Sequence, residues 1–216
     1  MLQIKRTQEP GRRKSQHRTR YFRCESCRES YTESVRLFVG IPLAESVNTE
    51  LSRLVEHLRS IAGFRWSAPA SWHITLQFLG NTTEDQYRQL VSQLGKIRSA
   101  PVPIRLGRLG IFERAGIFYA EVGETPELTA LQRRVMAAAA TCGFEPELRP
   151  FNPHITLARG KGPDRVRELR TLLARAPSDP KFARFSAAEF LLYESRLSPA
   201  GSEYQVRQRF PLETGS

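Results

Sequence analysis

Several features are scarce in this 216-residue sequence, and their scarcity argues against whole classes of protein. No run of about 18 apolar residues is present, so we expect no membrane-spanning helix and no membrane partner. With only three cysteines and no apolar run typical of a signal peptide, the sequence favours a location in the reducing cytoplasm. A phosphate-binding G-x-x-x-x-G-K-[ST] loop and a G-x-S-x-G nucleophile elbow are both missing, which disfavours an ATP-driven enzyme and a serine hydrolase.

The charge balance is strongly basic. The 33 Lys and Arg outnumber the 22 Asp and Glu, for a net charge of +11 and a pI near 10.2. This excess favours a polyanionic partner, although a basic surface without any ligand would give the same count. Residues 1–34 hold nine basic and four acidic side chains, so the remainder of the chain is basic without them.

The first 34 residues differ in composition from the rest. They are rich in Arg, Gln, Ser and Thr and show neither a helical nor a strand period. This predicts a basic, disordered extension at 1–34 ahead of a single domain at 35–212. Cys24 and Cys27 form a C-x-x-C pair, but a zinc ribbon needs a second pair, and Cys142 is a lone residue in a helical stretch. We therefore expect the extension to have no function of its own.

One tetrapeptide occurs twice. Residues 73–76 and 154–157 both read His-Ile-Thr-Leu, 81 positions apart. A given tetrapeptide of this kind is expected about 10⁻³ times by chance in a chain of this length. The repeat therefore indicates two equivalent settings, as in two half-domains that face each other across one site.

Both copies have the composition and alternation of a β-strand, in which side chains two apart share a face. In the first copy, the side chains expected to face the site are those of His73, Thr75 and Gln77. Those expected to face the core are Ile74, Leu76 and Phe78. The second copy is expected to direct toward the site His154, Thr156 and Ala158. By the same alternation, Arg159 belongs to the core-facing set, and it reaches the site only if the strand twists or ends there.

Two histidines and two threonines at one site suit paired acid–base chemistry better than metal binding. Zinc sites use three or four protein ligands, and neither site-facing set adds an Asp, Glu or Cys. One imidazole can take a proton from an attacking water while the other gives a proton to a leaving oxygen. The threonine hydroxyls can donate to an oxyanion between them, an arrangement that fits phosphodiester cleavage.

With these motifs, the sequence resembles the 2H phosphoesterase superfamily, and within it the RNA 2′,3′-cyclic phosphodiesterases, once described as 2′-5′ RNA ligases. The resemblance covers residues 35–212. Besides the two H-x-T motifs it includes the opening strand at 36–42 and Arg65-Trp66, then Gln77-Phe78-Leu79-Gly80, Ala158-Arg159, and the closing segments at 192–195 and Tyr204.

The resemblance implies an activity and a set of roles. It makes His73 the proton donor and His154 the proton acceptor, with Thr75 and Thr156 on the phosphate and Arg159 as a further phosphate contact. The implied reaction opens an RNA 2′,3′-cyclic phosphate to a 2′-phosphomonoester without metal or cofactor. The implied partners are RNA ends that carry a cyclic phosphate, with tRNA fragments as one example, and the implied enzyme is a monomer.

Other functions stay open at this stage. The same site could join RNA ends through 2′-5′ linkages, or the fold could bind RNA without catalysis. Small cyclic nucleotides or ADP-ribose cyclic phosphate could also be substrates. Three aromatic residues could stack on a base, although packing explains each as well: Trp66, Tyr119 and Phe151.

The remaining pattern mixes helices and strands without a regular alternation of strand, helix and strand. This predicts an α+β fold of two pseudo-symmetric lobes, each an antiparallel sheet with helices on its outer face and the active-site cleft between them. Strands are expected at 35–41, 64–67, 72–79, 104–112, 117–122, 184–194 and 203–212. Helices are expected at 44–61, 84–97, 126–141 and 164–175.

Overall fold

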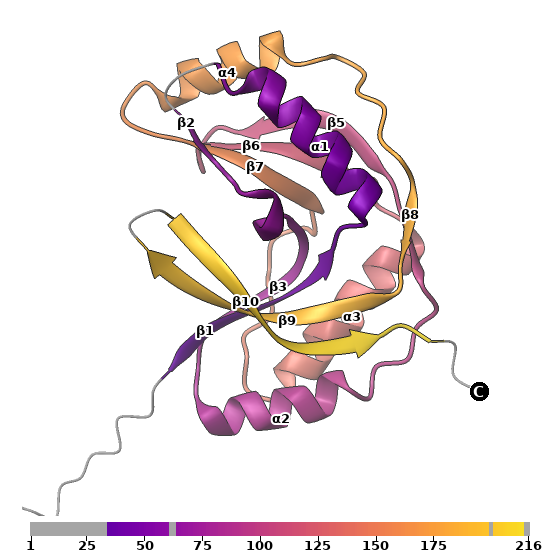
Figure 1. Cartoon of the computed structure of the whole chain (residues 1–216). Coiled ribbons are helices and arrows are strands. Elements are labelled where there is room, and N and C mark those ends of the chain that lie inside the picture. The colour runs from indigo at the N-terminus through magenta and orange to yellow at the C-terminus, as the bar shows by residue number, and fades with distance from the viewer. Residues whose placement is uncertain (1–33, 61–63, 199–200, 214–216) are drawn as a thin grey trace, which may run out of the picture. The chain divides into compact units, whose positions relative to one another are not determined.

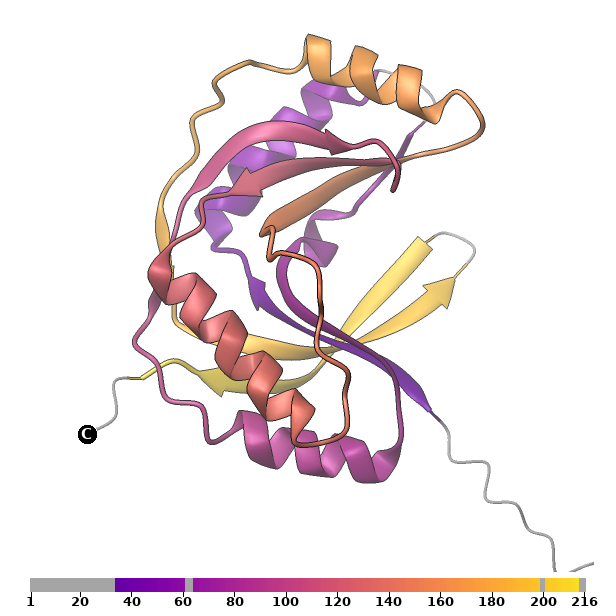
Figure 2. The same cartoon turned by 180° about the vertical axis from the view of Figure 1, so that it is seen from behind.

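A computed structural model describes residues 34–60, 64–198 and 201–213. The predicted extension, with its Cys24 and Cys27, lies outside the described residues apart from Ser34. The described residues form the body shown in colour in Figures 1 and 2.

The elements follow one another along the chain with the labels of Figure 1. The strands are β1 Val35–Pro42, β2 Phe64–Trp66, β3 His73–Thr82, β4 Val102–Ile104, β5 Leu106–Phe112, β6 Ile117–Val122, β7 His154–Gly160, β8 Phe185–Ala187, β9 Glu189–Ser198 and β10 Gly201–Pro211. The helices are α1 Glu45–Leu58, α2 Glu84–Leu94, α3 Pro126–Ala140 and α4 Arg165–Arg175, with a short 3₁₀ helix at Pro69–Ser71.

Two four-stranded antiparallel sheets form the two lobes. The first lobe has the strand order β10-β9-β1-β3, and the second has β2-β7-β6-β5. Figures 1 and 2 show α2 and α3 along the outer side of the first sheet and α1 and α4 along the outer side of the second. The predicted α+β class with two antiparallel sheets is therefore confirmed.

Local sequence explains where several helices begin and end. Thr83 opens α2 with a capping box, since its side chain accepts from the backbone N–H of Gln86 while the Gln86 side chain accepts from the backbone N–H of Thr83. Thr125 caps α3, with Pro126 at the first helical position. Gly143 follows α3 at φ +81°, a left-handed conformation that costs glycine little.

Two strands that were predicted to be continuous are each interrupted in the structure, so these two predictions are wrong. The stretch expected at 104–112 is divided between β4 and β5, and the stretch expected at 184–194 is divided between β8 and β9. The short pieces β4 and β8 pair with each other as a third, two-stranded sheet. Each predicted strand is divided because its two pieces pair with different strands. Periodicity within one segment does not indicate which distant strand a piece pairs with.

The apolar core runs through both lobes. It includes one face of α1, with Val47, Leu51 and Val55, and the core-facing side chains of both motif strands, such as Ile74 and Ile155. Burial of these apolar side chains fixes each motif strand against its sheet, which leaves the opposite strand face for the site. Among the described helices, none is both long and apolar enough to cross a membrane.

Candidate active site

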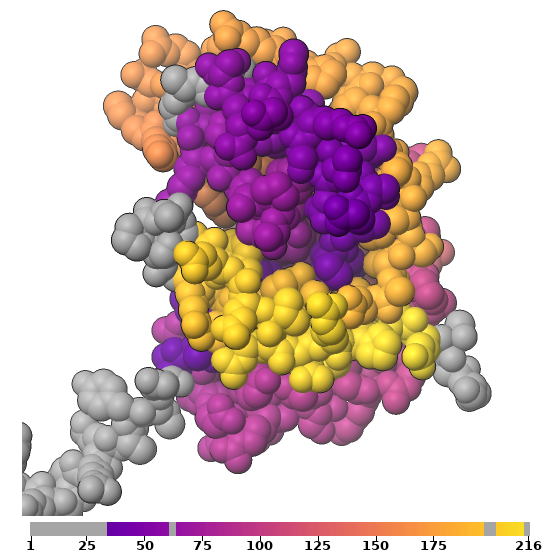
Figure 3. All heavy atoms as spheres, viewed as in Figure 1, coloured from indigo at the N-terminus to yellow at the C-terminus, as the bar shows by residue number. Residues whose placement is uncertain are grey.

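The two motif strands come together at one cleft. β3 lies at the edge of the first sheet and contacts β7 of the second. A cleft of about 810 Å³ is lined by both histidines, both threonines and Arg159. That size is within the usual range for small-ligand pockets. Figure 3 shows the surface hollowed between the atoms of β9 and β10, in yellow, and the indigo and purple segments above them.

Each motif strand contains a β-bulge at the same place. In β3, Thr75 pairs with Gly40 and Gln77 pairs with Val39, so Leu76 is the additional residue. In β7, Thr156 pairs with Tyr119 and Ala158 pairs with Phe118, so Leu157 is the additional residue. A bulge reverses the alternation that follows it. The repeat of sequence is thus a repeat of backbone geometry.

The bulges correct the predicted faces of two residues. Ala158 was expected at the site but is fully buried in the core, whereas Gln77, also expected there, lines the cleft although it is only 3% exposed. Phe78 was expected in the core but lines the cleft with 66% of its surface exposed. Arg159, at the position equivalent to Phe78, also lines the cleft. One sequence signal indicated that the alternation breaks: it placed a charged residue, Arg159, in the core. Because the motif is repeated, the same break applies to Phe78.

The two histidines are held in the same way. Nδ1 of His73 lies 2.8 Å from the carbonyl oxygen of Ser71, and Nδ1 of His154 lies 2.8 Å from that of Asn152. A carbonyl oxygen only accepts, so Nδ1 carries the hydrogen in each ring. In the neutral form, this leaves Nε2 of each imidazole as the bare nitrogen for proton transfer.

Aromatic rings enclose the two histidines to different extents. Around His73 lie three rings, with centroid distances of 4.5 Å to Phe38, 5.1 Å to Tyr204 and 5.6 Å to Tyr193. Around His154 lie two, with centroid distances of 4.9 Å to Phe112 and 5.5 Å to Tyr119. The first histidine is the more deeply enclosed of the two.

The enclosure lowers both pKa values. Burial lowers the pKa of His73 from 6.5 to about 4, with the hydrogen bond to Ser71 acting in the other direction and the charges of His154 and Arg159 adding to the lowering. The pKa of His154 is lowered by burial and by Arg159, against the hydrogen bond to Asn152. Near neutral pH the free site therefore holds two neutral imidazoles beside a guanidinium, a setting that attracts an anion.

Gly40 lets the backbone of β1 approach the first histidine closely. A Cβ at this position would lie 2.9 Å from the carbonyl oxygen of Ile74 and 3.3 Å from Cδ2 of His73. Only glycine leaves this space free. The position is therefore part of what keeps the His73 ring in place.

The remaining predicted aromatic residues lie at different places. Trp66 packs on the core side, with ring centroids 6.4 Å from Phe118. Tyr119 stacks on Phe112 at 4.1 Å and supports that ring beside His154. Phe151 lines the cleft. The resemblance includes Tyr204 only as part of the closing segment, and the structure adds it to the site, because Tyr204 lines the cleft from β10.

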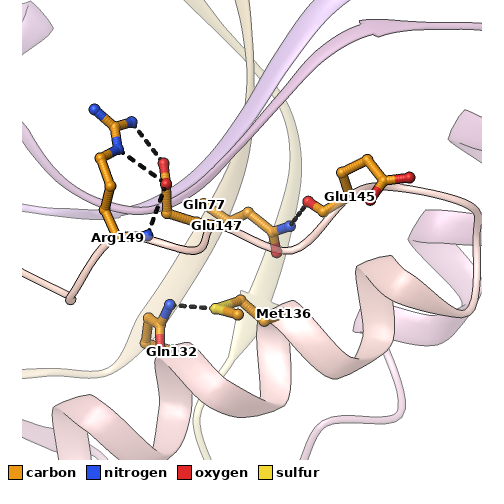
Figure 4. A network of polar contacts seen from close by, with 6 residues as sticks. All are labelled: Gln77, Gln132, Met136, Glu145, Glu147 and Arg149. Carbon is orange, nitrogen blue, oxygen red and sulfur yellow. Dashed lines mark hydrogen bonds and ion pairs between the residues drawn. The ribbon is translucent and has the colours of Figure 1, made fainter.

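A loop at 145–152 connects the two lobes and borders the cleft. Gln77 donates from Nε2 to the carbonyl oxygen of Glu145 over 3.5 Å, and Arg149 pairs with Glu147 through two contacts of 2.9 and 2.6 Å (Figure 4). Gln132 contacts the sulfur of Met136 beneath this loop (Figure 4). The buried amide of Gln77 thus joins the loop to the first motif strand.

Within residues 34–60, 64–198 and 201–213, no three His, Cys, Asp or Glu side chains are grouped as a metal-ion site would require. On the two motif strands, the predicted polar side chains that line the cleft are His73, Thr75, Gln77, His154, Thr156 and Arg159. Such a set can bind an oxyanion and exchange protons with it.

Known proteins share this architecture. A family model described as the 2′-5′ RNA ligase superfamily matches residues 47–196. A Geobacillus stearothermophilus protein named RNA 2′,3′-cyclic phosphodiesterase is 33% identical over 81% of this chain, which spans 56% of that relative's length. An Aquifex aeolicus protein of the same name is 31% identical over 82% of this chain and 97% of its own.

Solved structures agree with the family match. Escherichia coli LigT, crystallised with ATP, is 25% identical and covers 84% of this chain and all of its own, with a TM-score of 0.70. A Thermus thermophilus protein, TT0787, is 27% identical with the same coverage and a TM-score of 0.70.

Proposed function

The chain belongs to the 2′-5′ RNA ligase superfamily, and we propose that it hydrolyses RNA 2′,3′-cyclic phosphate ends to 2′-phosphomonoesters without a metal ion or cofactor. The family membership confirms the resemblance seen in the sequence. The observation that carries the proposal is the convergence of the two H-x-T strands on one cleft. Because both motifs come from one chain, a single copy completes the site, which supports a monomer.

The reaction needs two proton transfers. One histidine takes a proton from water as the water oxygen bonds to phosphorus, and the other gives a proton to the 3′-oxygen as the bond between phosphorus and that oxygen breaks. The 2′-oxygen keeps the phosphate. One proton has then moved between the histidines, and exchange with solvent restores the starting state.

The resemblance assigns the donor role to His73 and the acceptor role to His154, and we keep this assignment as a proposal. Burial lowers the pKa of His73 to about 4, so the free site holds little of its donor form near neutral pH. A donor role for His73 therefore requires that it gains its proton as the substrate binds. An anionic phosphate beside the ring raises the imidazole pKa and so favours this uptake.

The other polar side chains of the cleft suit the phosphate. The hydroxyls of Thr75 and Thr156 can donate to its non-bridging oxygens, and the Arg159 guanidinium supplies a positive charge on the same strand face. The exposed ring of Phe78 lies on the equivalent face of the other strand and offers a stacking surface for the base next to the phosphate. These four side chains form the proposed substrate-binding set.

The test is incubation of the pure protein, with EDTA, with RNA that ends in a 2′,3′-cyclic phosphate, followed by identification of the new end. We expect a 2′-phosphate. His73→Ala and His154→Ala should each lower the rate by about 10²–10⁴-fold, and the double variant should lose far less than the product of the two. His57→Ala, on the exposed side of α1, is the matched control and should retain the wild-type rate.

Losses for the two threonines should be smaller. Thr75→Ala and Thr156→Ala each remove one hydrogen bond to a charged phosphate, worth about 1–3 kcal/mol. Full activity of either single histidine variant, or a 3′-phosphate product, would contradict the proposed mechanism.

The name of the family model favours ligation as a second candidate. In ligation, the 5′-hydroxyl of another RNA would replace water as the attacking group, and the same bond to the 3′-oxygen would break. The assay separates the two reactions if a 5′-hydroxyl RNA is added, since ligation yields a longer strand with a 2′-5′ linkage. An RNA-binding module without activity would bind the substrate and leave its end unchanged.

A further inference from the structure

Four cationic side chains lie together where β7 leaves the cleft, and we call them the basic rim: Arg65, Arg114, Arg159 and Lys161. Arg65 of β2 pairs directly with Arg159 of β7, which in turn pairs with Ile117 of β6. The backbone N–H of Gly160 donates to the carbonyl of Gly116, which brings the β5–β6 turn and its Arg114 to the same end. Figures 1 and 2 both show β2, this turn and the end of β7 on one side of the second lobe.

No carboxylate pairs with the basic rim within the described part of the chain. The two acidic residues nearest in sequence are engaged elsewhere, since Glu113 binds Arg170 at 2.7 Å and Asp164 lies 3.5 Å from Arg167. All four rim side chains are exposed. Like charges directly opposite each other on neighbouring strands destabilise a sheet. Arg65 and Arg159 form such a pair, so their repulsion destabilises the pairing of β2 with β7. An anionic ligand would remove that cost.

The other end of β7 lacks this excess of positive charge. There the loop at 145–152 presents one arginine, Arg149, and Glu147 neutralises it through two contacts (Figure 4). Six steps along a strand separate His154 from Gly160, about 20 Å. The cleft is therefore strongly basic at one end only, and a polyanion bound at the phosphate site is drawn toward that end.

We propose that Arg65, Arg114 and Lys161 bind the sugar–phosphate backbone of the RNA strand whose 3′-terminal cyclic phosphate is held beside Arg159. This deepens the proposed function and rests on it: an RNA strand is a better substrate than a free mononucleotide. The contacts are to phosphates, so they add affinity without selecting a base sequence.

The test compares two substrates, 2′,3′-cyclic AMP and an eight-nucleotide RNA that ends in a 2′,3′-cyclic phosphate. Wild type should show the higher kcat/KM on the RNA. Arg65→Gln and Lys161→Gln should each lower kcat/KM on the RNA several-fold more than on the mononucleotide. Arg53→Gln, an equal loss of charge on an exposed position of α1, is the control and should change neither value.

Salt dependence of RNA binding gives a second readout. Each phosphate contact to a single strand contributes about 0.7 to the slope of log affinity against log salt. Three contacts predict about 20-fold weaker binding in 200 mM than in 50 mM salt, and loss of one contact reduces this to about sevenfold. Lys161 follows the last strand residue, so Lys161→Gln tests the rim without altering a strand pair.

Equal effects of the rim variants on both substrates, together with an unchanged salt slope, would overturn the inference. Hydrolysis of neither substrate by wild type would instead overturn the proposed function, and the binding measurement would still decide whether the rim holds RNA. Melting temperatures of Arg65→Gln and wild type show whether a loss comes from unfolding. If Arg65→Gln does unfold, the Lys161→Gln result decides.

Discussion

The buried imidazole of His73 makes the stability of this protein depend on pH in a predictable direction. An unfolded chain has a histidine pKa near 6.5, whereas burial between Phe38, Tyr193 and Tyr204 lowers the pKa of His73 to about 4. Between these values the unfolded chain binds more protons than the folded one. The free energy of unfolding therefore falls as pH falls from 6.5 to 4, and the contribution of His73 is lost in full below 4.

The size of this effect follows from the two pKa values. A difference of 6.5 to about 4 corresponds to a loss of about 3 kcal/mol from this one residue. Urea unfolding of wild type and of His73→Gln at pH 7.5, 6, 5 and 4 measures it, because glutamine does not titrate. Wild type should lose about 3 kcal/mol more than the variant between pH 7.5 and 4. Parallel loss in the two proteins would refute the proposed burial of a neutral imidazole.

The same pKa values set the pH dependence of activity. The paired mechanism needs one protonated and one neutral histidine, so kcat/KM should follow a bell whose limbs belong to the coupled pair in the free enzyme. Its acid limb should lie near pH 4, and its alkaline limb below 6.5, because the pKa of His154 is also lowered. The limbs of kcat should lie at higher pH, since the bound phosphate raises both values. A rate that rises steadily to pH 10 would indicate hydroxide chemistry instead.

Three further predictions concern other parts of the molecule. Gly40→Ala should lower the free energy of unfolding by about 1–3 kcal/mol, because its Cβ would press on the carbonyl oxygen of Ile74 and the ring of His73. The melting temperature and kcat/KM should therefore both fall, and wild-type values for both would contradict the close approach of β1 to His73. Phe78→Ala should raise KM for a nucleotide substrate at unchanged melting temperature, and Phe78→Tyr should restore it, since the exposed ring adds little to the core; an unchanged KM would remove its stacking role. Deletion of residues 1–34 should leave the melting temperature and the rate on 2′,3′-cyclic AMP as in the full chain, and a loss of folding together with bound zinc would show that the extension has a function.

Much of the site could be predicted because its histidines and threonines belong to one short sequence motif that occurs twice. The repeated His-Ile-Thr-Leu identified both histidines and both threonines, and the structure places all four in one cleft. Their position before each bulge is the reason: up to Thr75 and Thr156, simple alternation holds, and side chains two apart share a face.

Beyond each bulge, prediction from alternation failed. Phe78 lies at the cleft and Ala158 in the core because each motif strand has one residue, Leu76 or Leu157, without a partner on the neighbouring strand. A bulge arises between two paired strands, so it depends on the partner strand as well as on the bulged segment. The broken strands at 104–112 and 184–194 have the same explanation, because β4 and β8 leave their neighbours to pair with each other.

The two histidines separate what sequence determined from what only the tertiary structure decided. The identical local sequence determines the same strand setting, and each Nδ1 donates to the carbonyl two residues earlier over 2.8 Å. Their surroundings come from strands far away in the chain: Phe38, Tyr193 and Tyr204 enclose His73, whereas β5 and β6 supply the two rings beside His154. Since burial by those distant residues is the largest cause of the pKa of about 4 at His73, its value is a property of the packed lobe and not of the repeated motif.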